Sequence, residues 1–421
     1  MNQAIEAFLD RVCEQVKCRE VHDEIRLELG GHLEELVERY VGTGFSEIDA
    51  VRRALADMGD PVLIGQQLNE THQPRTDWGL IAATILLVVL GGWAMFAVDV
   101  SESSALGMNL FGAKLQWSAV GLSLGAVVLF VDYRRLRRYS FLLYGVTLAA
   151  SVLLSLWATR VNGQPRGLGH TPMLFAVALA GLFTVWDWDR PRTLVKAVAL
   201  FAAPLLVYLN YAALLGQFVA VCIVLLFLSR PRRWQAAVLA GSGFIAAAAG
   251  ALHIWMTPYL RMRVLTILFP TMDPLGSGYQ VTQSRLAIQQ AGRWGQGVTA
   301  NLDRVPDVQG KFVFPYLVYT LGWAAGIAIC LLIAFFLGRM LLASRQVKDP
   351  YGSYLVAVVG TLFAYRFGWN VLMAVGALPV ASVDLPFISQ GMQAAMQLAL
   401  VGLVLGVFRR KDMGRSPLLP G

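Results

Sequence analysis

The sequence predicts an all-α polytopic membrane protein with about ten transmembrane helices, preceded by a small cytoplasmic domain of three helices. Hydrophobic residues make up 56% of the 421 residues and charged residues only 15%, a composition outside the range of soluble proteins. Apolar runs long enough to cross a bilayer recur from residue 78 onward. Basic residues follow every second run, as the positive-inside rule requires of cytoplasmic loops.

The net charge of +8 is unevenly distributed along the chain. Residues 1–77 carry 16 acids and 8 bases, whereas the remainder carries 27 bases and 11 acids. Because these bases flank apolar runs, they indicate orientation in a membrane, and no nucleic-acid partner is expected. The four cysteines show no metal-ligand spacing, so neither a disulfide nor a metal site nor a cofactor is predicted; they are Cys13, Cys18, Cys222 and Cys330.

Residues 1–72 form the predicted N-terminal domain, and no cleavable signal peptide precedes it. Apolar residues at helical spacing predict helices over about 3–17 and 20–41. Ser46 begins a third helix, with Asp49 at the capping-box distance, and a glycine closely followed by Pro61 ends it.

The stretch HLEELVERYVGTGFSEIDAVRRALADMGDP in this domain is similar to small helical prefix domains of the HAAS type. That resemblance implies an interaction or signalling module with a cytoplasmic partner. Residues 73–77 would link it to the membrane region.

The membrane domain is predicted to span residues 78–410, followed by a cytoplasmic tail over 411–421. The predicted spans lie near 78–98, 113–131, 140–158, 171–187, 194–209, 211–228, 235–256, 315–337, 353–377 and 389–408. Arginines and lysines follow each even-numbered span, including Arg134, Arg190, Arg230, Arg345 and Arg409. This pattern puts both termini in the cytoplasm and the loop 257–314 outside the cell.

The loop between the seventh and eighth spans is the only long polar stretch of the membrane domain. Its arginines offer a planar fork of donors that suits a pyrophosphate; they include Arg261, Arg263, Arg285 and Arg293. Anchoring to lipid headgroups or salt bridging explains the same residues.

Two shorter patterns also predict a polar site. Gln280, Gln283 and Ser284 share one face of a short helix. This polar face could line a sugar site, or the helix could lie at the membrane interface with the polar face toward water. Pro379 and Pro386, with Ser389, predict a broken span, which is tolerated where it lines a protein cavity.

Several ordered motifs over about 78–410 resemble those of the FtsW/RodA/SpoVE family. One lies in the polar loop, a second in LPVASVDLPFIS at 378–389, a third in DYRRLRRYSFLLYGV at 132–146, and a weaker one in VNG at 161–163. The matching loop positions are Tyr259, Arg263, Asp273, Pro274, Gly278, Tyr279, Gln280, Gln283, Ser284, Ala287 and Ile288.

This resemblance implies polymerisation of a lipid-linked disaccharide-pentapeptide, the peptidoglycan precursor, together with a class B penicillin-binding transpeptidase. It also implies residence in the bacterial cytoplasmic membrane and a role in division, elongation or sporulation. The residues that it places at the substrate are Tyr259, Arg263, Asp273, Tyr279, Gln280, Gln283, Ser284, Pro386 and Ser389.

The sequence departs from the family where proton transfer is expected. The family has an essential Asp just before the eighth span, and Lys311 stands at that position here. A lysine ammonium is a poor base at neutral pH, and Asp307, four residues away, is at most a weak substitute. Other family motifs are also replaced: residues 289–292 read QQAG, residues 390–393 read QGMQ, and two glutamine-proline elements near the fourth and fifth spans have no counterpart.

Three hypotheses remain open on the sequence alone, so whether the chain is an enzyme is undecided. The first is a divergent peptidoglycan glycosyltransferase. The second is a catalytically silent membrane scaffold or sensor that binds the precursor or a cell-wall synthase. The third is a lipid flippase; acids inside the spans would mark an ion-coupled path, and the predicted spans have almost none.

Overall fold

The structure, a computed structural model, describes residues 3–17, 22–71, 76–102, 109–161, 163–188, 190–269, 278–298 and 306–411. The chain divides into two compact units. One unit comprises residues 1–76 with 408–421, and the other comprises residues 77–407. The second unit carries the apolar helices and the candidate site.

The N-terminal unit contains helices α1 (Gln3–Gln15), α2 (His22–Gly42), α3 (Glu47–Met58) and α4 (Pro61–Thr71). Their apolar faces meet in one core, which includes Leu9, Val12, Ile25, Leu33 and Val51. Ser46 caps α3 as predicted, because its hydroxyl accepts a hydrogen bond from the amide of Asp49.

The prediction of three helices in this region missed the fourth, α4. Pro61 was taken as the end of the third helix, but it is the first residue of α4. Proline suits that place, since the first amide of a helix has no partner within the helix. Asp60 stabilises the start of α4, because its Oδ1 accepts a hydrogen bond from Val62 N at 2.9 Å. At Gly65 a Cβ atom would lie 2.6 Å from Val12 O, so glycine lets α4 pack closely on α1.

All ten predicted spans are helical in the second unit. They are α5 (Trp78–Glu102), α6 (Leu110–Phe130), α8 (Ser140–Trp157), α9 (Thr171–Val185), α10 (Pro191–Tyr208), α11 (Ala212–Ser229), α12 (Arg233–Met256), α15 (Val313–Gln346), α16 (Pro350–Ala374) and α17 (Gln393–Arg409). By length and composition, 8 helices among the described residues can cross a membrane. Of the other two, α17 is a shorter apolar helix, and α10 carries Arg192 and Lys196 near its start.

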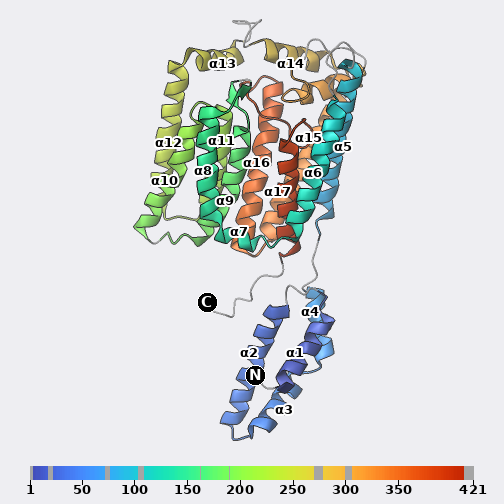
Figure 1. The fold of residues 1–421 in the computed structure, drawn as a ribbon, viewed down its shortest axis with the longest axis vertical. Helices are drawn as coiled ribbons and strands as arrows, with labels where there is room; N and C mark the ends of the chain where they lie inside the picture. The colour runs from blue at the N-terminus through green and yellow to red at the C-terminus, as the bar shows by residue number, and fades with distance from the viewer. Residues whose placement is uncertain are drawn as a thin grey trace. The chain divides into compact units, whose positions relative to one another are not determined.

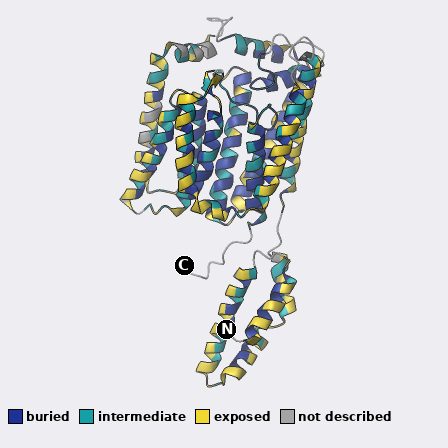
Figure 2. Ribbon diagram, in the orientation of Figure 1, coloured by how far each residue is buried: buried dark blue, intermediate teal, exposed yellow. Residues whose placement is uncertain are grey.

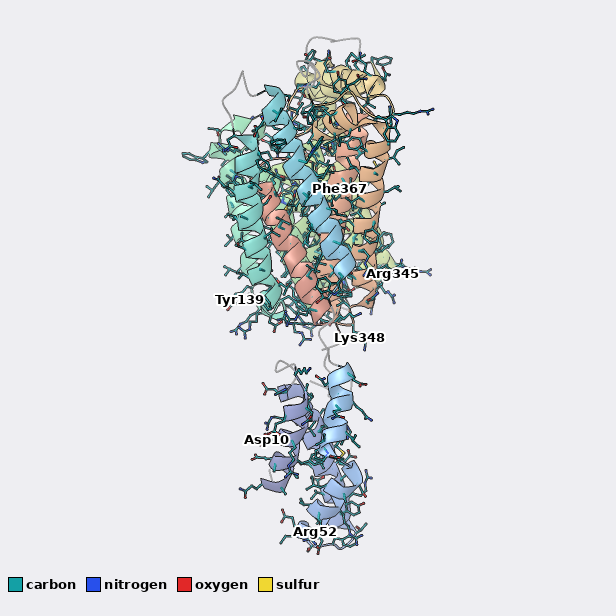
Figure 3. The ribbon with its side chains drawn as sticks, turned by 90° about the vertical axis from the view of Figure 1, so that its right-hand side faces the viewer. Asp10, Arg52, Tyr139, Arg345, Lys348 and Phe367 are labelled. Carbon is teal, nitrogen blue, oxygen red and sulfur yellow. The ribbon has the colours of Figure 1, made fainter. Side chains whose placement is uncertain are left out.

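Short elements connect these helices. They are α7 (Arg134–Arg138), the antiparallel pair β1 (Arg160–Val161) and β2 (Gln164–Pro165), the 3-10 helix η2 (Leu168–His170), α13 (Pro258–Leu268) and α14 (Tyr279–Gln290). Helices α13 and α14 lie across one end of the bundle (Figure 1). Tyr139, Arg345 and Lys348 lie at the opposite end, whereas Phe367 lies inside the bundle (Figure 3). Which end faces the cytoplasm stays a prediction from the charge pattern.

Helix α16 is central to the bundle, because it contacts α9, α11 and α15. Its inward face is buried, while the outer helices expose large apolar side chains such as Phe141, Trp157 and Phe227 (Figure 2). An exposed apolar surface of this extent is typical of helices that face lipid. The interior therefore holds the polar side chains that the bilayer would not accept.

Candidate functional site

The site is built around the turn at residues 306–312, which precedes α15. The amides of Gly310 and Phe312 both donate to Asp307 O, at 3.1 and 3.2 Å. This turn buries Lys311, which is 4% exposed, and brings its Nζ to 3.6 Å from Asp307 Oδ2. Lys311 is therefore ion-paired inside the protein.

The second part of the site is the segment between α16 and α17. It contains no helix from Val375 to Met392, so the expected interruption of the span by Pro379 and Pro386 is confirmed. Pro386 and Ser389 are both buried. The ring of Phe387 stacks on Phe363 with centroids 5.1 Å apart.

Helix α5 comes very close to this segment. A Cβ atom at Gly91 would lie 2.6 Å from Phe387 O, so only glycine permits this approach. The amide of Phe387 donates to Gln397 Oε1 of α17 at 2.8 Å. The segment is thus held between α5 and α17, with its backbone hydrogen-bonded.

Hydrogen bonds join the turn to the segment directly. Ser389 Oγ donates to Gly310 O at 2.8 Å and accepts from Leu385 N at 2.9 Å. The amide of Gln390 donates to Gln309 O at 2.9 Å. Ser389, predicted at the substrate, therefore has a structural role in fixing the two segments side by side.

Asn370 of α16 completes this connection. Its Nδ2 donates to Lys311 O at 2.9 Å and to Val383 O at 2.8 Å. Because one nitrogen donates to both carbonyl oxygens, the backbones at residues 311 and 383 lie close together. Asp384, the next residue, is thus a close neighbour of Lys311 although the sequence separates them widely.

Two further cations enter the site from the helices. Lys114 lies one turn into α6, is 1% exposed, and donates from Nζ to Phe387 O at 2.5 Å and to Ser389 O at 2.9 Å. Arg366 lies one turn before Asn370 on the same face of α16. It is 3% exposed and donates to Gly169 O at 2.7 Å and to Gln393 Oε1.

Asp384 is the second carboxylate of the site and is only partly buried. Within the described part of the chain, its carboxylate makes no hydrogen bond and no ion pair. Burial raises the pKa of the Asp384 carboxyl above its ordinary value, while the charges of Arg366, Lys311 and Lys114 oppose that rise.

Asp307 behaves similarly. Burial raises the pKa of its carboxyl, and Lys311 opposes that rise without cancelling it. The site thus gathers three cations and two carboxylates, an excess of positive charge in a mostly buried place. Within the described residues, Arg366 Nε and Asn370 Oδ1 are buried without a hydrogen-bond partner.

A pocket adjoins this cluster and shares the α16–α17 segment with it. Pro379, Val380, Ala381 and Ser382 form one wall, and the adjacent residues 383–389 belong to the charged cluster. Polar or aromatic residues line one part of the pocket, including Gln164, Asn210, Tyr211 and Trp369. Apolar residues of α12 and α13 line another part, including Ile254, Leu260 and Val264. The pocket can therefore contact a ligand that is polar at one end and apolar at the other.

Two residues of α14 make hydrogen bonds to the end of α16. Ser284 is fully buried, and its Oγ donates to Ala374 O at 2.7 Å. Arg285, expected to face phosphates, donates to Val375 O and Gly376 O at 3.0 and 3.1 Å. Both residues hold α14 against the end of α16, where carbonyls lack partners within the helix.

The remaining predicted residues are placed as follows. Tyr279 and Gln280 are partly buried at the start of α14, and Gln283 Oε1 is buried without a partner in the described structure. Tyr259 and Arg263 belong to α13, but their side chains lie outside the described residues, as does all of Asp273.

Sequence reasoning missed Lys114, Arg366, Asn370 and the position of Asp384. An available signal was the presence of a lysine and an arginine inside apolar spans. Such residues are costly in a membrane and mark functional sites. In the sequence, Asp384 stands out only as an acid next to the Leu-Pro-Phe motif at 385–387.

Comparison with known proteins now decides the family. The sequence profile of the family described as "Cell cycle protein", FtsW/RodA/SpoVE, matches residues 77–412. The chain belongs to this family. It is 31% identical to the probable peptidoglycan glycosyltransferase FtsW of Thioalkalivibrio sulfidiphilus, covering 85% of this chain and 95% of that protein. With the FtsW of Halorhodospira halophila it shares 28% identity, over 79% of this chain and 89% of the relative.

Solved structures agree on the fold. The chain is similar to one in a structure named "Structural coordination of polymerization and crosslinking by a peptidoglycan synthase complex", with a TM-score of 0.65, 22% identity, and coverage of 80% and 98% of the two chains. The rod shape determining protein RodA of Thermus thermophilus matches with a TM-score of 0.54 at 20% identity, over 80% and 97%. The chain is therefore a multi-pass membrane protein with the helical fold of the FtsW/RodA/SpoVE family.

Proposed function

We propose that this protein binds a lipid-linked peptidoglycan precursor and takes part in cell-wall synthesis in the bacterial cytoplasmic membrane. Relatives of similar length are named probable peptidoglycan glycosyltransferases, which supports this substrate class. The observation that carries the proposal is the buried cluster of Lys114, Lys311 and Arg366, because it suits an anionic group that leaves water.

The charge balance fits a pyrophosphate better than a neutral sugar. Three cations outnumber the two carboxylates, and Arg366 Nε is a buried donor without a partner in the described structure. Arginine binds phosphate oxygens through several directed N–H groups. The adjoining pocket, with its apolar wall from α12 and α13, would take the part of the lipid next to the pyrophosphate.

Binding and catalysis are separate questions here. Lys311 and Asp307 neutralise each other at 3.6 Å, so neither is a ready proton acceptor at the position where the family has its Asp. The proposal therefore rests on precursor binding, which a catalytically silent scaffold would share with an active polymerase.

The topology and partners of the proposed function follow from the sequence. Both termini would face the cytoplasm, and the loop 257–314 with its neighbouring site would face outward, where the precursor is used. A class B penicillin-binding transpeptidase would accompany the membrane domain. Residues 1–72 would bind a cytoplasmic partner.

Binding of a fluorescent lipid-linked disaccharide-pentapeptide to the full chain in lipid nanodiscs tests the proposal. Arg366→Gln is expected to weaken binding by about tenfold or more, the effect of losing one strong charged contact. Arg366→Lys, which keeps the charge, should lose less affinity.

Arg339→Gln is the matched control. Arg339 is another arginine of the bundle and is partly buried, but it pairs with Asp77 at 2.7 Å and makes no described contact with the site. Equal affinity of the wild type and Arg366→Gln, or no binding by the wild type, would contradict the proposal.

A further inference from the structure

The carboxylate missing from position 311 has a counterpart on the neighbouring segment. Asp384 follows Val383, whose carbonyl shares the Asn370 Nδ2 donor with the carbonyl of Lys311. The two segments are also joined between Ser389 and Gly310 and between Gln390 and Gln309. A side chain at position 384 therefore starts beside the place where the family has its acid.

The two carboxylates of the site differ in availability. Asp307 is ion-paired with Lys311, whereas the carboxylate of Asp384 has neither a hydrogen bond nor an ion pair to any described residue. Asp384 and Asp307 are both partly exposed, whereas Lys311 is buried. Of the two, Asp384 is the carboxylate that no described ion pair occupies.

The backbone around Asp384 holds it in place, and nearby charged groups act on its carboxyl. The carbonyl before it accepts from Asn370, and the amide after it donates to Ser389 Oγ at 2.9 Å. The charged groups that act on it are Arg366 of α16, Lys114 of α6, and Asp307 and Lys311 of the turn. Burial raises the pKa of the Asp384 carboxyl, and the three cations oppose that rise by favouring the ionised form, which is the form that accepts a proton.

We propose that Asp384 is the proton acceptor of this site and that the protein polymerises the precursor through it. This inference rests on the proposed function, because it requires two precursor molecules to bind. Lys311 and Asp307 then act as a neutral pair, and the catalytic carboxylate comes from the 383–390 segment instead of the turn.

The step is a glycosyl transfer. A hydroxyl of the acceptor sugar gives its proton to the Asp384 carboxylate, and its oxygen forms a bond to the anomeric carbon of the donor. The bond from that carbon to the phosphate oxygen breaks, and its electron pair leaves with the pyrophosphate. Arg366 and Lys114 lie where they would stabilise the charge on the leaving group. Asp384 then releases its proton to water.

The test measures polymer formation from lipid-linked precursor by the full chain, with a partner transpeptidase present, and precursor binding in parallel. Asp384→Asn is expected to lower the polymerisation rate by about a hundredfold or more, the usual contribution of a general base. Its precursor affinity should stay within about threefold of the wild type. Asp384→Glu should recover part of the rate.

Asp187→Asn serves as the matched control, since Asp187 is an exposed acid paired with Arg190 at 3.2 Å in another connecting segment. The pH profile separates the proposed role from a structural one: the decline in rate at low pH should disappear in Asp384→Asn, leaving only a flat residual activity.

Two outcomes would overturn the inference while the proposed function stands. One is a wild type that binds the precursor and makes no polymer. The other is Asp384→Asn polymerising within about threefold of the wild-type rate. Absence of precursor binding by the wild type would overturn both.

Discussion

The turn at 306–312 and the segment 383–390 meet at one site, yet they carry their charges differently. In the turn, the acid and the base neutralise each other, and the base is buried. In the segment, a single acid is partly exposed, and the backbone on both sides of it is hydrogen-bonded. The comparison teaches that two adjoining segments can treat a carboxylate differently: the turn pairs it with a buried lysine, whereas the segment leaves it without a described ion pair.

The largest effect is expected from separating the two segments at Asn370. Asn370→Ala removes both hydrogen bonds from Nδ2 and leaves the carbonyls of Lys311 and Val383 buried without a donor. Two such losses should cost about 3 kcal/mol of unfolding free energy and abolish polymerisation. Thermal unfolding in detergent measures the first effect and the polymer assay the second.

Asn109→Ala is the control for this change. Asn109 caps α6 at an exposed position, so its loss should cost about 1 kcal/mol. If Asn370→Ala were no more destabilising than Asn109→Ala, the two segments would not depend on this contact.

A smaller effect should follow from loosening the 383–390 segment alone. Lys114→Met leaves the carbonyls of Phe387 and Ser389 without their charged donor. We expect a loss of about 2 kcal/mol and faster hydrogen exchange in residues 383–390, with the turn less affected. Hydrogen exchange followed by mass spectrometry measures this difference. Lys196→Met, at an exposed position on α10, should change neither quantity.

The next effect is expected from a substitution that breaks the Asp307–Lys311 ion pair in the turn. Asp307→Asn leaves the Lys311 ammonium buried without its acid and should cost about 1–3 kcal/mol, because part of the charge can still be solvated. The double variant Asp307→Asn with Lys311→Met removes both charges and should recover most of that loss. A double-mutant cycle on unfolding free energies gives the coupling. A coupling free energy near zero would mean that Asp307 and Lys311 do not stabilise each other.

The smallest expected effect is the pH dependence of stability. Burial raises the pKa of Asp384, so the folded protein holds a proton there more tightly than the unfolded chain does. The contribution of Asp384 to stability is therefore greatest at low pH and is lost as the pH rises through the folded pKa. Asp384→Asn should flatten the wild-type pH profile of the melting temperature above the ordinary pKa of an aspartate, about 4. Identical profiles would exclude this linkage.

Much of the fold could be predicted from the sequence, because a bilayer demands long apolar helices. Every predicted span is a helix, with ends that differ from the prediction by a few to several residues. The omission of α4 has a local cause, since a proline can start a helix as well as follow one. The broken span at Pro379 and Pro386 was also predictable, because proline cannot continue the hydrogen-bond ladder.

The site was only partly predictable. The role of motif residues such as Ser389 at the substrate stays a prediction, and the contacts of Ser284 and Arg285 with the end of α16 could not be predicted from the sequence. The closeness of positions 311 and 384 depends on how α15 and α16 pack and on one asparagine. No periodicity in the sequence reports such a contact. For that reason Asp384 could not be connected with Lys311 before the structure was known.

Moving the acid back to the turn tests the central claim most directly. The measurement compares polymerisation rates of the wild type, Asp384→Asn, and the double variant Lys311→Asp with Asp384→Asn. If the place of the carboxylate in space decides activity, the single variant should lose about a hundredfold and the double variant should return to within about tenfold of the wild type. An active wild type with a double variant as inactive as Asp384→Asn would contradict the account.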